Sequence, residues 1–384
     1  FTWGIPVTFD PGHVVYVWVD ALSNYITALG YMNDKYDDYD KYWPCDVHFI
    51  GKEIVRFHSI IWPAMLMSME MPLPKKVYGH GWLVIDGGKM SKSKGNVVDP
   101  YMLADMFGVD ALRFFLLRTF PFGSDGNFSN ELLISTINTD LANDLGNLVS
   151  RTTAMAVKYF GGTLPCEREY DAVDDELVSM AKALREKYAF QMDKFQLHLA
   201  LDEIFKVIQR ANKYIDETAP WVLAKDEAQQ DRLAEVLYNL TESITIGASL
   251  LHSFLPETAE KIVAQLNTTL REFDDLDKFG LYESGTKVTD KPEILFGRLK
   301  AEDVMPEVEK IQAVQKAEFE AEQAKLAAVE GKAACGCGAG ENAADGADLE
   351  PMDVEAKEEI TFDDFEKLQF QVGKIIKCEE VKKS

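Results

Sequence analysis

The pattern of apolar residues changes near residue 129, and this change limits the folds open to the chain. Before it, short runs rich in β-branched and aromatic residues alternate with helical runs, which is typical of a parallel α/β sheet with buried strands. After it, helical periodicity dominates to about residue 266, which predicts a helical bundle. We therefore expect two folded domains, at residues 1–128 and 129–300.

The elements of both domains follow from the same pattern. Strands are predicted at residues 14–19, 46–51, 76–79 and 82–85, with helices at 20–31 and 53–69 between them. In the second domain helices are predicted at residues 129–160, 174–191, 195–218, 228–254 and 256–266. We expect Gly161 and Gly162 to end the first of these helices and Pro256 to begin the last.

The acidic charge of the chain is concentrated near its C-terminal end. The 384 residues carry a net charge of −24, and residues 301–360 hold 16 Asp and Glu against 5 Lys and Arg. This composition predicts a disordered acidic linker at residues 301–359. A net negative charge argues against nucleic acid as a partner, but the local field at a contact matters more than the total.

Cysteine usage and hydropathy bear on the compartment. Five cysteines are present, and this odd, sparse set implies no disulfide framework, which fits a reducing cytoplasmic setting. Cys335 and Cys337 offer two thiolates where a closed zinc site takes four ligands, so we interpret them as linker. No apolar run approaches the ~20 residues of a membrane helix, so no membrane partner is expected. We expect both ends, Phe1 and Ser384, to be truncations.

The most specific motif is a lysine-rich stretch between glycines, Lys89-Met90-Ser91-Lys92-Ser93-Lys94-Gly95. A mobile cationic loop of this kind suits the formation of an aminoacyl adenylate from ATP, because negative charge builds up on phosphate oxygens in the transition state. The alternative is a solvated basic turn. The small residues interleaved at fixed spacing favour the mobile loop.

The spelling Lys-Met-Ser-Lys-Ser resembles the second signature of class I aminoacyl-tRNA synthetases. The resemblance implies a Rossmann-type catalytic domain that uses ATP with Mg²⁺ as a substrate. It implies a catalytic role for Lys89 and Lys92, with Met90, Ser91 and Ser93 completing this part of the ATP site. The first signature, His-x-Gly-His, is absent, and His80-Gly81 is not it. Half of the ATP site is therefore missing, and we expect this fragment alone to be inactive.

Two further segments, at residues 17–25 and 49–58, resemble methionyl-tRNA synthetases. The resemblance implies a role for Glu53 at the ATP ribose, and it implies a methionine pocket lined by Trp18, Ala21, Tyr25, Ile54 and His58. Aromatic walls suit the polarizable thioether, and a Tyr hydroxyl or a His N–H could donate to its sulfur. Leu22 stands where one branch of the family has proline. The alternative is that these aromatics and His58 belong to a core.

A polar stripe is predicted on the first helix of the second domain. Asn143, Asn147 and Arg151 recur every four residues, and Leu141, Leu145 and Leu148 form an apolar face elsewhere on the helix. Trp221, after Pro220 at a helix end, could stack on an unpaired base. A merely solvated face is the alternative. In methionyl-tRNA synthetases the positions matching Asn143, Asn147, Arg151, Pro220 and Trp221 contact the CAU anticodon.

Together these features predict a methionine-tRNA ligase with L-methionine, ATP and methionine tRNA as substrates. Residues 360–384 resemble the start of an OB-type β-barrel that binds tRNA and dimerises in relatives, so a homodimer is expected if that domain were complete. Zinc is expected only in the missing N-terminal half. The alternatives are a leucyl, isoleucyl or valyl synthetase, and a non-catalytic tRNA-binding protein.

Overall fold

The computed structural model describes residues 4–85, 88–89 and 99–308, and also residues 310, 311, 313, 314, 317 and 321. The chain separates into two compact units, Phe1–Ala324 and Lys325–Ser384, and the described residues all belong to the first. The predicted start of a β-barrel at residues 360–384, and most of the predicted linker, lie outside the described residues.

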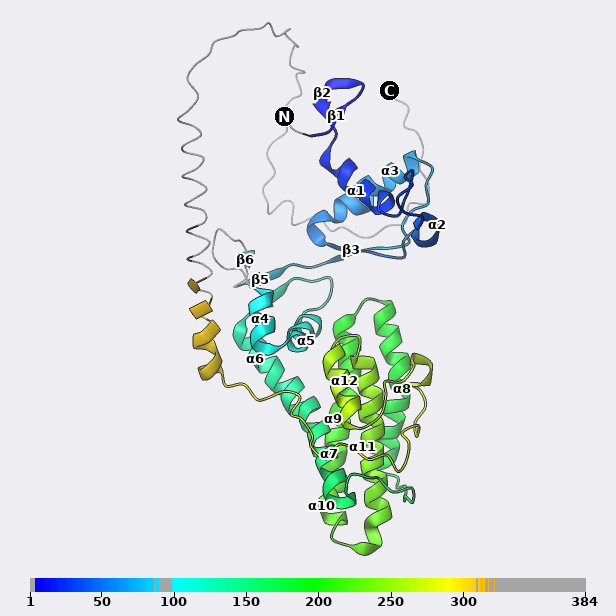
Figure 1. Ribbon diagram of the computed structural model, residues 1–384, viewed down its shortest axis with the longest axis vertical. Helices are drawn as coiled ribbons and strands as arrows, with labels where there is room; N and C mark the ends of the chain where they lie inside the picture. The colour runs from blue at the N-terminus through cyan, green and yellow to red at the C-terminus, as the bar shows by residue number, and fades with distance from the viewer. Residues whose placement is uncertain are drawn as a thin grey trace, which may run out of the picture. The chain divides into compact units, whose positions relative to one another are not determined.

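The strands of the N-terminal part form three small sheets (Figure 1). β1 (Pro6–Val7) and β2 (Asp10–Val14) pair antiparallel, and β3 (His48–Gly51) pairs in parallel with β4 (Val77–His80). β5 (Leu83–Ile85) lies between β6 (Gly88–Lys89), which runs antiparallel to it, and β7 (Gly126–Phe128), which runs parallel. The strands predicted at residues 46–51, 76–79 and 82–85 are thus confirmed, whereas β1, β6 and β7 were not predicted.

The strand predicted at residues 14–19 is wrong beyond its first residue. β2 ends at Val14, and helix α1 (Val17–Thr27) begins three residues later. The apolar run was assigned by its β-branched and aromatic composition, but Trp18, Leu22 and Ile26 recur every four residues and so share one face of a helix. Leu22 and Ile26 are buried there, so packing on a helical face outweighs the local strand preference.

The helical stretch after β3 changes its winding along its length. It begins as the 3₁₀ turn η1 (Lys52–Ile54), continues as the π-helix η2 (Phe57–Ile61) and ends as the helix α3 (Trp62–Ser68). The helix predicted at residues 53–69 is therefore confirmed in extent. With α1 and the short helix α2 (Tyr39–Tyr42) it encloses a small core that consists of Leu22, Ile26, Trp43, Trp62, Leu66 and Met71.

Two helices that follow the lysine-rich stretch pack into the core of the bundle. These are α4 (Pro100–Phe107) and α5 (Val109–Thr119), and their residues Leu103 and Phe114 belong to the same cluster as those of the bundle. At the end of α5, the Arg118 guanidinium pairs with Asp140 and Asp202, two carboxylates of the bundle.

All five helices predicted in the second domain are present in the bundle. Its helices are α6 (Asn130–Thr136), the π-helix η4 (Ile137–Gly146), α7 (Asn147–Phe160), α8 (Asp174–Asp193), α9 (Leu197–Thr218), α10 (Pro220–Leu223), the 3₁₀ turn η5 (Glu227–Gln229), α11 (Gln230–Leu251), α12 (Pro256–Gln265) and the 3₁₀ turn η6 (Phe273–Asp275). The helix predicted at residues 129–160 is continuous, but ten of its residues form the π-helix η4. Gly161 ends it in the left-handed conformation, as predicted.

The predicted linker is wrong at its start. Residues 301–308 are helical, and the Val308 side chain is fully buried in the core of the bundle. Val304, Val308 and Ile311 recur at helical spacing and pack against that core, so this acidic segment has one apolar side despite its charge. Among the described residues, we find no helix with the length and apolarity needed to span a membrane.

Candidate functional site

An aromatic cluster forms between α1 and the helical stretch that follows β3, at the place of the predicted methionine pocket. The ring of Trp18 stacks on Phe57 with centroids 3.9 Å apart, and the Tyr25 and His58 rings meet edge to face at 5.6 Å. Trp18, Ala21 and Tyr25 lie three and four residues apart, so they share a side of α1. Ala21 is exposed and both aromatics are half-buried, whereas Leu22 and Ile26, on the adjoining side of the helix, are buried.

Hydrogen bonds engage both ring nitrogens of His58. Its Nδ1 lies 3.0 Å from the carbonyl oxygen of Ile54, and its Nε2 lies 2.8 Å from the Tyr25 hydroxyl. Because a carbonyl can only accept, Nδ1 donates to Ile54. In the tautomer in which Nε2 accepts from Tyr25, neither the ring nor the Tyr25 hydroxyl has a further proton to donate to a ligand sulfur.

Three residues around this cluster were not predicted. Phe57 forms the stack with Trp18, and His48 on β3 lies 4.3 Å from the Tyr25 ring. The Trp62 indole N–H donates to His48 Nε2 at 3.2 Å. Burial, and then the neighbouring His58, lower the pKa of His48 to about 4, so His48 is neutral at physiological pH. Phe57 adjoins His58 in the sequence, but nothing in the local pattern places His48 next to Tyr25.

Glu53 is the second residue after β3, in the 3₁₀ turn η1 at the carboxyl end of that strand. Its Oε2 accepts a hydrogen bond of 2.9 Å from the Trp82 indole N–H. The side chain is exposed, so it is accessible to a ligand. The carboxyl ends of parallel strands are the usual place for nucleotides in open α/β sheets, and the positions of β3 and Glu53 agree with that rule.

The lysine motif is described only in part. The main chain of Lys89 pairs with Val84 in the β5–β6 hairpin. The Lys89 side chain and the residues Met90, Ser91, Lys92 and Ser93 lie outside the described residues. The hairpin therefore positions the start of the motif next to the sheet that also carries β7.

Two of the three residues of the predicted polar stripe are exposed, and the third, Arg151, is half-buried. Asn143 and Asn147 are exposed, whereas Leu141, Leu145 and Leu148 are buried. Asn143 lies on the π-helix η4 and Asn147 begins α7, so the stripe does not follow the uniform winding of 3.6 residues per turn that was expected.

Arg151 connects this stripe to the junction of α9 and α10. Its guanidinium pairs at 3.2 Å with Asp216, which lies in the last turn of α9. Ala219 then adopts a left-handed conformation, and Pro220, which is buried, begins α10. The Trp221 side chain is 43% exposed, so it is not a core residue.

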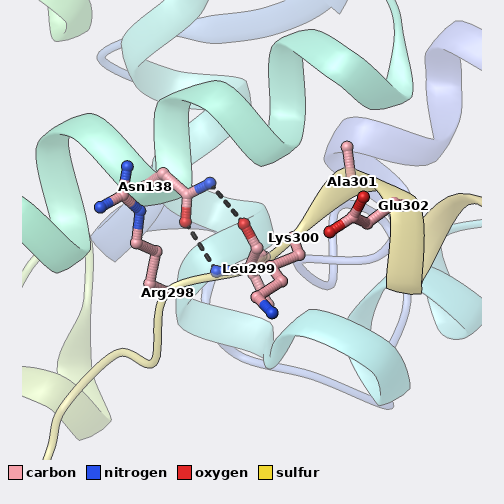
Figure 2. A pocket seen from close by; sticks show the side chains of 6 residues that line it. All are labelled: Asn138, Arg298, Leu299, Lys300, Ala301 and Glu302. Carbon is pink, nitrogen blue, oxygen red and sulfur yellow. Dashed lines mark hydrogen bonds between the residues drawn. The ribbon is translucent and has the colours of Figure 1, made fainter.

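A separate cavity of about 730 Å³ lies between η4 and the segment at residues 298–302. Figure 2 shows the Asn138 amide, which donates to the carbonyl of Leu299 and accepts from its N–H. None of the predicted site residues lines the cavity. Within the described residues, no group of three or more His, Cys, Asp and Glu side chains is placed to hold a metal ion.

Two family models match the chain, and they divide it near the start of the bundle. The model described as "tRNA synthetases class I (M)" matches residues 1–153. The model described as "Anticodon binding domain of methionyl tRNA ligase" matches residues 164–316. The aromatic cluster and Glu53 lie in the first match and Trp221 in the second, whereas the Asn143, Asn147 and Arg151 stripe lies at the end of the first.

Curated relatives agree with these matches. The methionine-tRNA ligases of Clostridium acetobutylicum and Caldanaerobacter subterraneus subsp. tengcongensis are 50% and 51% identical to the chain over its whole length. The chain spans 55% of each of these relatives. The solved methionyl-tRNA synthetase of Mycobacterium tuberculosis in complex with methionyl-adenylate is 43% identical, with a TM-score of 0.72 over 78% of this chain and 59% of that one.

Proposed function

We propose, since this chain belongs to the methionyl-tRNA synthetase family, that it forms part of an enzyme that activates L-methionine with ATP and transfers it to methionine tRNA. The chain spans about half the length of the curated relatives it matches. The remainder of the longer protein would complete the ATP site.

The aromatic cluster at the predicted methionine pocket is the observation that carries this proposal. Trp18, Phe57 and Tyr25 supply ring faces and edges that suit a flexible thioether, whose sulfur makes favourable contacts with aromatic rings. Because the Tyr25–His58–Ile54 chain consumes the nearby donors, we infer that methionine is selected by fit and by sulfur–aromatic contact rather than by a hydrogen bond to sulfur. An aliphatic side chain of the same length would lose the sulfur contacts.

The activation step follows from the charges that the reaction creates. A carboxylate oxygen of methionine attacks the α-phosphorus of ATP, a new P–O bond forms, and the bond to pyrophosphate breaks. We propose that Lys89 and Lys92 stabilise the phosphate charge that grows in the transition state, with Met90, Ser91 and Ser93 shaping the loop. Glu53 would accept hydrogen bonds from the ribose, and Mg²⁺ would arrive bound to the phosphates of ATP.

For tRNA, we propose that the exposed stripe and Trp221 read the anticodon. The amides of Asn143 and Asn147 can pair with base edges, the Arg151 fork can contact bases or phosphate, and Trp221 offers a ring for stacking. Buried Pro220 fixes the turn that presents this ring. Exposure of Asn143, Asn147 and Trp221 supports the proposal, because base recognition requires groups that the protein itself leaves accessible.

The test is methionine-dependent exchange of pyrophosphate into ATP by the full-length protein. Lys92→Ala should slow exchange by about a hundredfold or more while the Kd for methionine stays within about twofold, because the charge it meets is largest in the transition state. Lys187→Ala, an exposed lysine on α8, is the matched control and should exchange at the parent rate. Parent protein that shows exchange without methionine dependence would contradict the proposed substrate.

A further inference from the structure

Three polar side chains, Lys52, Glu53 and Asp125, converge on Trp82, just before β5. The Lys52 ammonium lies 4.1 Å from the centroid of the Trp82 ring and 2.6 Å from a carboxylate oxygen of Asp125. The other oxygen of Asp125 accepts from the Trp82 main-chain N–H at 2.8 Å. The indole N–H of Trp82 donates to Glu53 at 2.9 Å. Both ends of the tryptophan are therefore held, its main chain by Asp125 and its ring by Lys52 and Glu53.

The backbone around Trp82 is equally constrained. A Cβ at Gly81 would collide with the main chain of Ser124, so residues 81 and 124 are in backbone contact. The hydrogen bond from Lys52, followed by that from the Trp82 N–H, lowers the pKa of Asp125, which keeps this carboxyl ionised and able to accept. The main-chain position of Trp82 and the direction of its indole toward Glu53 are therefore both fixed.

Gly51 supplies an independent observation about Glu53. The φ of Gly51 is −69° and its ψ is 147°, values that any residue adopts, so the backbone does not require glycine here. A Cβ at this position would nevertheless collide with both carboxylate oxygens of Glu53. The absence of a side chain at residue 51 thus leaves room for the Glu53 carboxylate in the position where it accepts from Trp82.

We infer that Trp82 is a positioning residue, which orients the Glu53 carboxylate toward the ribose hydroxyls of the nucleotide. The inference rests on the proposed role of Glu53 in ATP binding and deepens it. An ionised carboxylate has about four acceptor sites, so the bond from the indole orients it without exhausting its capacity to accept. Lys52 and Asp125 act one step further away, by holding the ring and main chain of Trp82.

The experiment measures nucleotide discrimination in the full-length enzyme by pyrophosphate exchange. The parent should lose at least about tenfold in kcat/KM when ATP is replaced by 2′-deoxy-ATP or by 3′-deoxy-ATP, since a bond to a charged acceptor is lost. Trp82→Phe keeps an aromatic ring for Lys52 but removes the N–H. It should reduce kcat/KM for ATP about tenfold and cut the discrimination to about threefold or less, with the KM for methionine unchanged.

Gly51→Ala should displace the same carboxylate while the Trp82 indole stays in place. It should therefore give the same loss of discrimination between ATP and its deoxy analogues.

The outcomes separate the role of Glu53 from the role of Trp82. If the parent enzyme uses both deoxynucleotides as well as it uses ATP, the role of Glu53 is refuted. A discriminating parent whose Trp82→Phe variant discriminates equally well overturns the positioning role of Trp82. A uniform fall in kcat/KM for ATP and both analogues, with discrimination intact, also overturns it, because that is the behaviour of a merely structural tryptophan.

Discussion

At the aromatic cluster Trp18, Tyr25 and His58 are packed into the protein, whereas Asn143, Asn147 and Trp221 on η4, α7 and α10 are exposed. His58 is 2% exposed and lies within hydrogen-bond distance of two other groups of the protein. Trp221 is 43% exposed, and Asn143 and Asn147 are exposed as well. The same types of residue, an aromatic ring and a polar side chain, thus serve in two different settings.

The chemistry of the two ligands explains the difference. A methionine side chain is apolar, so the walls that bind it resemble the interior of the protein. An unpaired base offers polar edges and flat faces, so the residues that read it must leave donors, acceptors and rings accessible. A substitution in the pocket should therefore disturb folding and binding together, and a substitution in the stripe should disturb binding alone.

The largest effect is expected for His58→Ala. It removes a ring that accepts from Tyr25 and donates to Ile54, so it leaves unpaired groups and a cavity. We expect the free energy of unfolding to fall by about 3 kcal/mol and kcat/KM for methionine to fall by at least about a hundredfold. Chemical denaturation and pyrophosphate exchange measure the two effects.

Next in size is the contrast between two neighbours on η4. Leu141 is fully buried, so Leu141→Ala should cost about 3 kcal/mol in the free energy of unfolding, within the usual range for such truncations. Asn143→Ala, two residues away and exposed, should change it by less than about 0.5 kcal/mol. Equal losses of stability would show that the stripe is packed, and would remove the distinction between the two regions.

The bundle could be predicted well from the sequence because its helices are long and regular. Leu141, Leu145 and Leu148 mark the buried side by their spacing alone, and Gly161 marks the end of α7. Periodicity over many residues averages out local exceptions. The outward direction of Asn143 and Asn147 follows from the same spacing, so their exposure could be predicted from the sequence.

The pocket was predictable only by resemblance, because short elements carry little periodicity. Residues 14–19 read as a strand, yet Val17 begins α1, and the π-helices η2 and η4 have no signal in composition. The contacts of His48 with Tyr25 and of Trp82 with Glu53 join residues 23 and 29 positions apart. Such pairs are set by how β3 and its neighbours meet, which no local pattern encodes.

A smaller effect is expected for Trp221→Ala in the bundle. Stacking on an aromatic ring is worth about 1–3 kcal/mol per base, so affinity for methionine tRNA should fall by about one to two powers of ten. Because the ring is partly solvent-exposed, the free energy of unfolding should change by less than about 1 kcal/mol, and pyrophosphate exchange should stay at the parent rate. Undiminished preference for tRNA with the CAU anticodon would remove Trp221 from the proposed interface.

The pH dependence of stability should carry the smallest effect, and it tests whether the pocket is part of a core. The pKa of His48 is lowered from 6.5 to about 4 in the folded protein, by burial first and by His58 second. Between these two values the unfolded state binds the proton and the folded state does not, so stability rises with pH through this window. The stabilisation is complete above about pH 6.5 and is lost as the pH falls toward 4.

We therefore expect this one group to lower the free energy of unfolding by about 2 kcal/mol between pH 7 and pH 5. His48→Gln cannot be protonated, and its side-chain oxygen can still accept from the Trp62 indole, so the variant isolates the titration from the lost hydrogen bond. Urea denaturation of parent and variant at both pH values shows how much stability each protein loses on acidification. If the two proteins lose stability equally on acidification, His48 is solvated in solution, and the pocket is then more open than its buried neighbours Leu22 and Trp62 imply.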